Sequence, residues 1–125
     1  MKIMVVDDEK DIKLLFEQRF RKEIKSGKLA FLFAFSGEEA KDYIELNGSE
    51  NLNQILSDIN MPGMNGLELL KWIKNNYPEL KVAMITAYGD PENYKQAVEY
   101  GADDYMTKPI DFGQLKQKVL PQTDN

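Results

Sequence analysis

Carboxylates follow two apolar segments of this chain, and few other groups capable of chemistry accompany them. Asp7 and Asp8 come directly after the run K-I-M-V-V, and Asp58 directly follows I-L-S. The chain contains no cysteine and no histidine. Thiolates and imidazoles are therefore excluded as nucleophiles, bases and metal ligands, and any chemistry must use carboxylates, hydroxyls and lysines.

A hydroxyl and an ammonium group end two further apolar segments. Thr86 ends K-V-A-M-I-T, and Lys108 follows D-Y-M-T. Each of these residue types also has an ordinary structural role, since acids cap helices, threonine suits strands and lysine before proline is commonly solvated. Their joint occurrence at the ends of predicted strands favours a shared site.

A hard cation and a phosphoryl group fit this set of side chains. Three crowded carboxylates repel one another and raise at least one pKa unless a cation or an ammonium group is near. Oxygen donors without histidine or cysteine suit Mg²⁺, which is held by one or two carboxylates, water and a phosphate. Lys108 offers a positive charge, and Thr86 a hydroxyl donor, for phosphoryl oxygens.

The site exists only if the predicted elements bring these residues together. Strands are predicted at residues 2–6, 29–35, 54–57, 81–86 and 104–107. Apolar residues at helical spacing predict five helices, around residues 12–20, 40–44, 67–73, 94–101 and 112–119. This alternation predicts an α/β fold, a doubly wound five-stranded parallel sheet with helices on both faces. In such sheets the working site lies at the carboxyl ends of the strands.

Length and composition limit the class of protein. With 125 residues, 42% hydrophobic and 30% charged, the chain is expected to form one globular domain. A net charge of -5 argues against direct contact with nucleic acid. No apolar run approaches the roughly twenty residues of a membrane span, and no signal peptide is evident. We therefore expect a cytoplasmic protein without a membrane partner.

Four segments carry a resemblance to a known family. They are V-V-D-D-E at residues 5–9, D-I-N-M-P-G-M-N-G at 58–66, I-T-A at 85–87 and G-A-D-D-Y-M-T-K-P at 101–109. With them, residues 2 to about 120 resemble the receiver domain of two-component response regulators, of the chemotaxis-regulator type. The resemblance implies a flavodoxin-like fold with strand order 2-1-3-4-5. We expect one receiver domain over residues 1–125, either complete or the N-terminal part of a longer regulator.

The resemblance also implies roles for the acidic residues. Asp58 would be the phosphoacceptor, receiving its phosphoryl group from a sensor histidine kinase or a histidine phosphotransfer protein. Asp8, Asp58 and the backbone carbonyl of Asn60 would ligate Mg²⁺, and Asp7 would act largely through metal-bound water. The domain would catalyse only its own phosphorylation and dephosphorylation, so it is not expected to be an enzyme with a separate substrate.

Further roles are implied for residues around the acids. Lys108 and Thr86 would contact the phosphoryl group, and the Lys108–Pro109 bond is usually cis in the family. Tyr105 would turn inward when Thr86 moves and remodel the face formed by the helix from Pro91, the strand at 104–107 and the last helix. That face could serve an output or a homodimer. Asn60 and Tyr88 would tune the lifetime of the phosphate, and we expect Tyr88→Ala to shorten it.

Three other interpretations compete with a phosphorylated receiver. A magnesium phosphohydrolase would need an acid two residues beyond its nucleophile on the first strand, whereas Lys10 lies two residues beyond Asp8. A flavodoxin-like flavin protein would need a phosphate-binding loop where this chain has D-D-E-K, which repels phosphate. A phosphate-independent docking module of receiver type usually lacks an acid, the threonine or the lysine, and here all are present.

Overall fold

Five parallel strands form a single sheet in the computed structural model, which describes residues 1–87 and 90–120. The strands are β1 (Lys2–Val6), β2 (Ala30–Ala34), β3 (Gln54–Asp58), β4 (Lys81–Thr86) and β5 (Asp104–Thr107). Their order is β2-β1-β3-β4-β5, so β2 and β5 are the edges. The predicted fold and strand order are confirmed.

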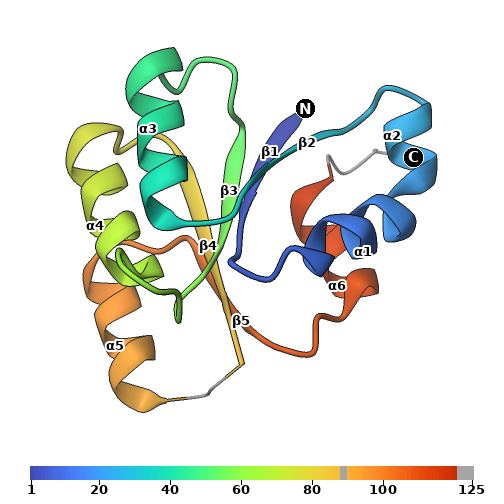
Figure 1. Cartoon of the computed structure of the whole chain (residues 1–125). Helices are drawn as coiled ribbons and strands as arrows, with labels where there is room; N and C mark the ends of the chain where they lie inside the picture. Colours follow the sequence, from blue (N-terminus) through green and yellow to red (C-terminus); the bar gives the residue numbers. More distant parts are fainter. Residues whose placement is uncertain (88–89, 121–125) are drawn as a thin grey trace.

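Helices cover both faces of this sheet (Figure 1). They are α1 (Asp11–Arg19), α2 (Arg21–Lys25), α3 (Gly37–Asn47), α4 (Gly66–Asn76), α5 (Pro91–Glu99) and α6 (Phe112–Val119). In Figure 1, α3, α4 and α5 lie on one side of the sheet, and α1, α2 and α6 lie on the other. None of the described helices combines the length and apolarity needed to cross a membrane.

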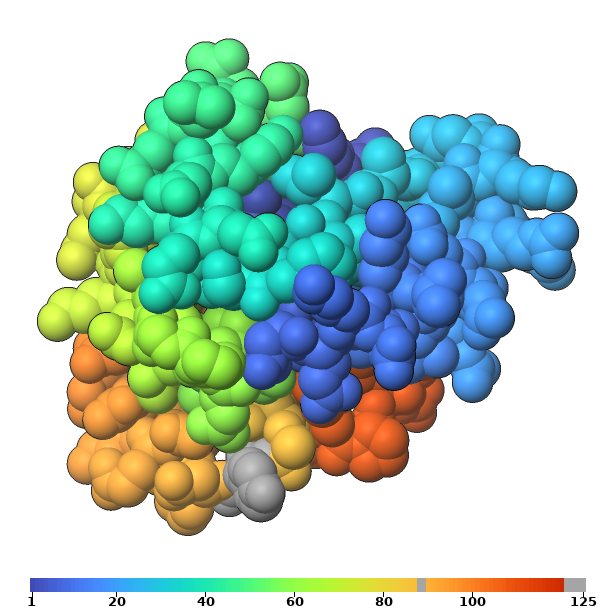
Figure 2. All heavy atoms as spheres, in the orientation of Figure 1, coloured from blue at the N-terminus to red at the C-terminus, as the bar shows by residue number. Residues whose placement is uncertain are grey.

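A short additional helix, α2, follows the first predicted helix, which gives six helices where five were expected. The two are separated at Phe20, whose φ of -108° and ψ of 21° leave the helical region. Phe20 is completely buried, whereas the next turn, α2, buries none of its residues. The regular apolar spacing thus ends at Phe20, and α2 is a separate exposed turn, light blue in Figure 2, that projects from the edge of the molecule.

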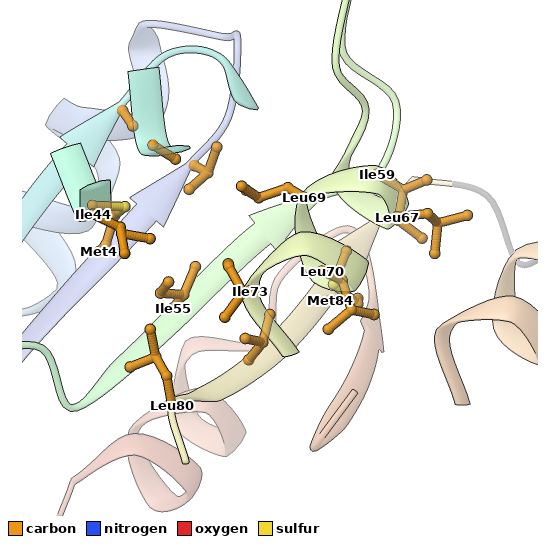
Figure 3. Packing of buried hydrophobic residues seen from close by; sticks show 14 of the residues in the cluster. Met4, Ile44, Ile55, Ile59, Leu67, Leu69, Leu70, Ile73, Leu80 and Met84 are labelled. Carbon is orange, nitrogen blue, oxygen red and sulfur yellow. The ribbon is translucent and has the colours of Figure 1, made fainter. Parts of the chain in front are cut away.

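The apolar strands supply both layers of the core, as their continuous apolarity predicts. In β1, Met4 and Val6 belong to the cluster beneath α3, α4 and α5, whereas Ile3 and Val5 belong to the cluster beneath α1 and α6. Figure 3 shows part of the first cluster, in which Ile55 of β3 lies among side chains of α3 and α4. Burial on both faces holds the central strands rigidly, and these strands carry the acids of the site.

Aromatic rings fasten α1 and α6 to the β2 edge. The ring of Phe16 lies 5.4 Å from Phe31, 6.3 Å from Phe33 and 5.3 Å from Phe112, each at a steep angle. Such edge-to-face pairs add about 0.5–1.5 kcal/mol each beyond the burial of their area. The cluster fixes α6, and therefore the segment that precedes it, against the start of the chain.

Helices α3 and α4 begin at side-chain caps. Ser36 accepts a hydrogen bond from the backbone N–H of Glu39 at 3.0 Å. Asn65 accepts from the N–H of Glu68 at 2.9 Å, and Glu68 accepts in return from the N–H of Asn65 at 3.1 Å. This capping box fixes the point at which the loop after β3 becomes α4.

Candidate functional site

Three carboxylates meet at the carboxyl ends of β1 and β3. Asp7 and Asp8 follow β1, and Asp58 is the last residue of β3. Each offers a carboxylate oxygen, and these oxygens lie within 4.8 Å of one another. Asp7 and Asp58 are buried, 4% and 8% exposed, whereas Asp8 is exposed. The sheet therefore assembles the acidic cluster as predicted, with one side open to solvent.

Lys108 brings its ammonium group to this cluster from the end of β5. Its backbone N–H donates to the carbonyl of Thr86 at 2.7 Å, which aligns the ends of β4 and β5. Its Nζ lies 2.9 Å from Oδ2 of Asp7 and 3.2 Å from Oδ2 of Asp58. The peptide bond that follows, to Pro109, is cis, as the resemblance implies. One ammonium group thus bridges two buried carboxylates.

The backbone around Asp58 holds the carboxylate in one orientation. Its Oδ1 accepts a hydrogen bond from the N–H of Ile59 at 2.7 Å, while Oδ2 faces Lys108. Ser57 is buried, and its Oγ donates to the carbonyl of Asp58 at 2.9 Å, so the hydroxyl has a hydrogen-bond partner inside the core. Gly66 packs so closely that a Cβ there would collide with that same carbonyl.

The charges of the cluster are strongly coupled. Burial raises the pKa of Asp58, and the charge of Asp7 raises it further, while Lys108 opposes both. Burial alone would lower the pKa of Lys108, but its hydrogen bond to Asp7 and the charge of Asp58 outweigh this effect and raise it. The lysine therefore stays protonated beside the two carboxylates.

Replacing the bridging lysine is expected to destabilise the fold in a pH-dependent way. In Lys108→Met the two carboxylates lose their counter-charge and the pKa of Asp58 rises further. The folded state then retains a proton that the unfolded state releases, so stability falls as the pH rises through this pKa. We expect a loss of about 2 kcal/mol at neutral pH, less than for a fully buried pair because the lysine side chain is 21% exposed.

Urea unfolding at neutral pH and at about pH 5 measures this effect. Lys74→Met is a matched control, because Lys74 is also partly buried and pairs with Asp103 at 2.8 Å, at the opposite end of the sheet. The loss in Lys108→Met should shrink at the lower pH, whereas the loss in Lys74→Met should change little. A pH-independent loss in Lys108→Met would contradict the coupling.

The other predicted site residues differ in their burial and in their contacts. Thr86 is completely buried at the end of β4, and its backbone is bonded to Lys108. Asn60 is exposed in the loop after β3. Tyr105 lies on β5, with its ring 5.1 Å from that of Tyr94, and its hydroxyl is buried without a hydrogen-bond partner among the described residues. Tyr88 lies outside the described residues.

One neighbour of the site was not foreseen from the sequence. Glu38, in the first turn of α3, accepts a hydrogen bond from the backbone N–H of Met64 at 3.0 Å. This bond is the largest cause of a lowered pKa for Glu38. Glu38 and Met64 are 26 residues apart, and an acid in the first turn of a helix suits the helix dipole without any further partner. The sequence therefore offered no signal for the contact.

The donor set agrees with a hard divalent cation. Among the residues that the structure describes, Asp7, Asp8 and Asp58 form the group of carboxylates close enough to share an ion. All the donors are oxygens, and the exposed side at Asp8 leaves access for water and phosphate. The site thus offers the oxygen ligands that a hard cation such as Mg²⁺ prefers.

Sequence comparisons place the chain among response regulators. A family model described as the response regulator receiver domain matches residues 3–120. Sporulation initiation phosphotransferase F of Bacillus subtilis is 33% identical over 127 residues, covering 99% of this chain and 97% of that protein. Response regulator protein PilR of Pseudomonas aeruginosa is 38% identical over 118 residues, covering 94% of this chain and 25% of that protein. The chain thus spans about a quarter of the longer relative.

Solved structures agree with this placement. A CheY-like receiver domain protein of Methanospirillum hungatei has a TM-score of 0.82 at 31% identity, covering 94% of this chain and 89% of that one. Response regulator protein TrrA of Thermotoga maritima, solved in complex with Mg(2+)-BeF, has a TM-score of 0.76 at 32% identity, covering 94% and 95%. Because the family model spans nearly every described residue, this chain belongs to the receiver domains of two-component response regulators.

Proposed function

We propose that the chain accepts a phosphoryl group on the carboxylate of Asp58 and so changes the face formed by α5, β5 and α6. The observation that carries this proposal is the setting of Asp58. Its Oδ1 is held by the backbone of Ile59, and its Oδ2 lies beside the ammonium of Lys108 and two further acids. An oriented carboxylate with a cation and metal donors beside it can attack phosphorus.

The donor in this proposal is a phosphohistidine on another protein. The chain has no histidine, so a sensor histidine kinase or a histidine phosphotransfer protein must supply it. A carboxylate oxygen of Asp58 forms the new bond to phosphorus, and the phosphorus–nitrogen bond breaks with its electrons passing to the imidazole. The product is an acyl phosphate on Asp58. Mg²⁺, when held by Asp7, Asp8, Asp58 and the carbonyl of Asn60, would neutralise charge on the phosphoryl oxygens.

Lys108 and Thr86 contact the phosphoryl group once it is bound to Asp58. The new group carries about -1.5 to -2 charges, and the ammonium that lies 3.2 Å from Asp58 is close enough to follow it. Thr86 moves toward the phosphoryl oxygens, and Tyr105 turns inward behind it. Asn60 and Tyr88 control how quickly water removes the phosphate. The domain catalyses only this reaction on itself.

The face that responds has features of a docking surface. Tyr94 and Val98 of α5 are 53% and 57% exposed, and Lys118 of α6 pairs with Asp104 of β5 at 2.9 Å. Apolar side chains beside an ion pair suit either an output partner or a second copy of the chain. A phosphate-independent docking module is less favoured, because the acids, Thr86 and Lys108 all lie in place.

Intact mass spectrometry tests the proposal. Wild-type protein incubated with Mg²⁺ and a small phosphodonor, such as phosphoramidate or acetyl phosphate, should gain one phosphoryl group. Chelating the metal should reduce the rate of this gain by at least about tenfold, because the donor's charge is then opposed by three carboxylates. Folded protein that gains no phosphate with metal present would favour the docking module.

A further inference from the structure

The loop that leads from the site into α4 is tied to another helix by a single hydrogen bond. The backbone N–H of Met64 donates to Oε2 of Glu38, on α3, at 3.0 Å. Within residues 60–64, all of which the structure describes, no other backbone N–H donates a hydrogen bond. The apolar anchors of the segment are Met61, which is 8% exposed, and Met64, which is partly buried against the core. The carboxylate of Glu38 is therefore the polar restraint on this segment.

The packing around this bond leaves little space. Gly63 has a φ of 71°, and a Cβ there would collide with Oε2 of Glu38. A Cβ on Gly37 would lie 2.7 Å from the carbonyl oxygen of Met64. In Figure 2 the teal surface at the start of α3 adjoins the yellow-green surface of this loop and of α4. Glycine on both sides thus lets the carboxylate reach the Met64 amide.

The segment that Glu38 restrains contains Asn60. The loop is fixed at its start, where Ile59 bonds to Asp58, and at its end, where Gly66 donates to the carbonyl of Ile59 at 2.8 Å. Asn60 lies between these points, is exposed, and makes no backbone hydrogen bond to any of the described residues. The position of the Asn60 carbonyl therefore depends on the conformation of the rest of the loop.

We propose that Glu38 is a positioning residue: by holding the Met64 amide from α3, it keeps the loop, and with it the carbonyl of Asn60 proposed as a metal ligand, in one conformation. The use of the Asn60 carbonyl as a metal ligand rests on the proposed function. The restraint of the loop by the hydrogen bond from Met64 to Glu38 does not depend on it. Glu38 touches neither the phosphoryl group nor the metal. Its loss therefore weakens metal binding and leaves the chemistry at Asp58 intact.

Three variants distinguish the effect of the Glu38 hydrogen bond from the effect of its negative charge. Glu38→Ala removes both, while Glu38→Gln removes the charge and keeps an oxygen that can accept from Met64. Asp42→Ala is the matched control, because Asp42 is an exposed acid on the same helix whose side chain forms no hydrogen bond or ion pair with the residues that the structure describes. Wild type and all three variants are first compared by thermal unfolding.

Amide hydrogen exchange without metal is the first measurement. We expect exchange of the Met64 amide to be about two- to tenfold faster in Glu38→Ala, the range that loss of one hydrogen bond produces. Glu38→Gln should recover most of the protection, and Asp42→Ala should match wild type. Unchanged exchange in Glu38→Ala would overturn the proposed restraint, whether or not the protein accepts phosphate.

Magnesium titration is the second measurement, followed by calorimetry or by amide chemical shifts. We expect the dissociation constant in Glu38→Ala to rise about two- to tenfold, with the phosphorylation rate at saturating Mg²⁺ unchanged. Equal weakening in Glu38→Gln and Asp42→Ala would show a charge effect only and overturn the positioning role. Failure of the wild type to take phosphate would instead refute the proposed function and leave the exchange result standing.

Discussion

Asp58→Asn should take no phosphoryl group under conditions in which the wild type gains one. The amide keeps the shape of the side chain and an oxygen for the N–H of Ile59, which donates to Asp58 at 2.7 Å. It lacks the anionic oxygen that must attack phosphorus, so the loss should be complete. Intact mass after incubation with Mg²⁺ and a phosphodonor measures it, and a phosphorylated Asp58→Asn would show that another residue is the acceptor.

The same variant should be more stable than the wild type at neutral pH. Burial raises the pKa of Asp58, so the ionised carboxylate opposes folding, and its stabilising contribution is present only at low pH, where it is protonated. The neutral amide removes this penalty, and Lys108 keeps its partner Asp7 at 2.9 Å. We expect a rise of about 2–5 °C in the unfolding midpoint.

Measuring the unfolding midpoint over a range of pH distinguishes an electrostatic gain in stability from a gain with another cause. The difference between Asp58→Asn and wild type should be largest at neutral pH and should shrink as the pH falls through the pKa of Asp58. The wild-type carboxyl is then protonated and resembles the amide. A midpoint below that of the wild type, or a gain equal at every pH, would contradict the electrostatic account. If Asp58→Asn is more stable than the wild type but takes no phosphate, the aspartate at this position lowers stability in exchange for function.

Gly66→Ala should destabilise the fold by about 3 kcal/mol or more and displace the acceptor. A Cβ at this position would collide with the carbonyl of Asp58, which is backbone and cannot rotate away. The start of α4 or the end of β3 must therefore move, and either movement disturbs the carboxylate. Urea unfolding measures the stability, and the phosphorylation rate of the remaining folded protein should fall.

Gly48→Ala provides the comparison for this steric effect. Gly48 has a φ of 73°, so alanine is strained there, but no atom lies within 4 Å of its Cβ position. With a ψ of -175° its backbone lies in a region that only glycine adopts readily, so the substitution should cost about 1–3 kcal/mol from backbone strain alone. Phosphorylation should be unchanged. Similar losses in the two variants would mean that the close approach at Gly66 is relieved by small shifts of the backbone.

The parts of the structure that could be predicted depend on short-range pattern and topology. The continuous apolarity of β1 indicated burial on both faces, and its alternate residues do enter separate clusters. Topology then brings Lys108 to Asp7 across 101 residues, because parallel strands end at one edge of the sheet. The acidic cluster and its lysine could therefore be foreseen without any knowledge of individual contacts.

Contacts between loops and helix ends could not be foreseen in the same way. The hydrogen bond from Met64 to Glu38 depends on how the loop after β3 passes the start of α3, and neither segment carries a periodic pattern that records it. The short helix α2 was missed for a related reason, because none of its residues is buried and no apolar spacing therefore marks it in the sequence.

The position of Lys108 along the chain also bears on how the protein assembles. The ammonium that neutralises Asp7 and Asp58 arrives with β5, the last strand and an edge of the sheet. Any partly folded form that lacks β5 holds the three acids together without their counter-charge, and mutual repulsion disfavours it. Attraction to the acids then favours docking of β5 and α6. The charges that prepare the site for chemistry therefore also make the final closure of the sheet cooperative, and penalise incomplete folding.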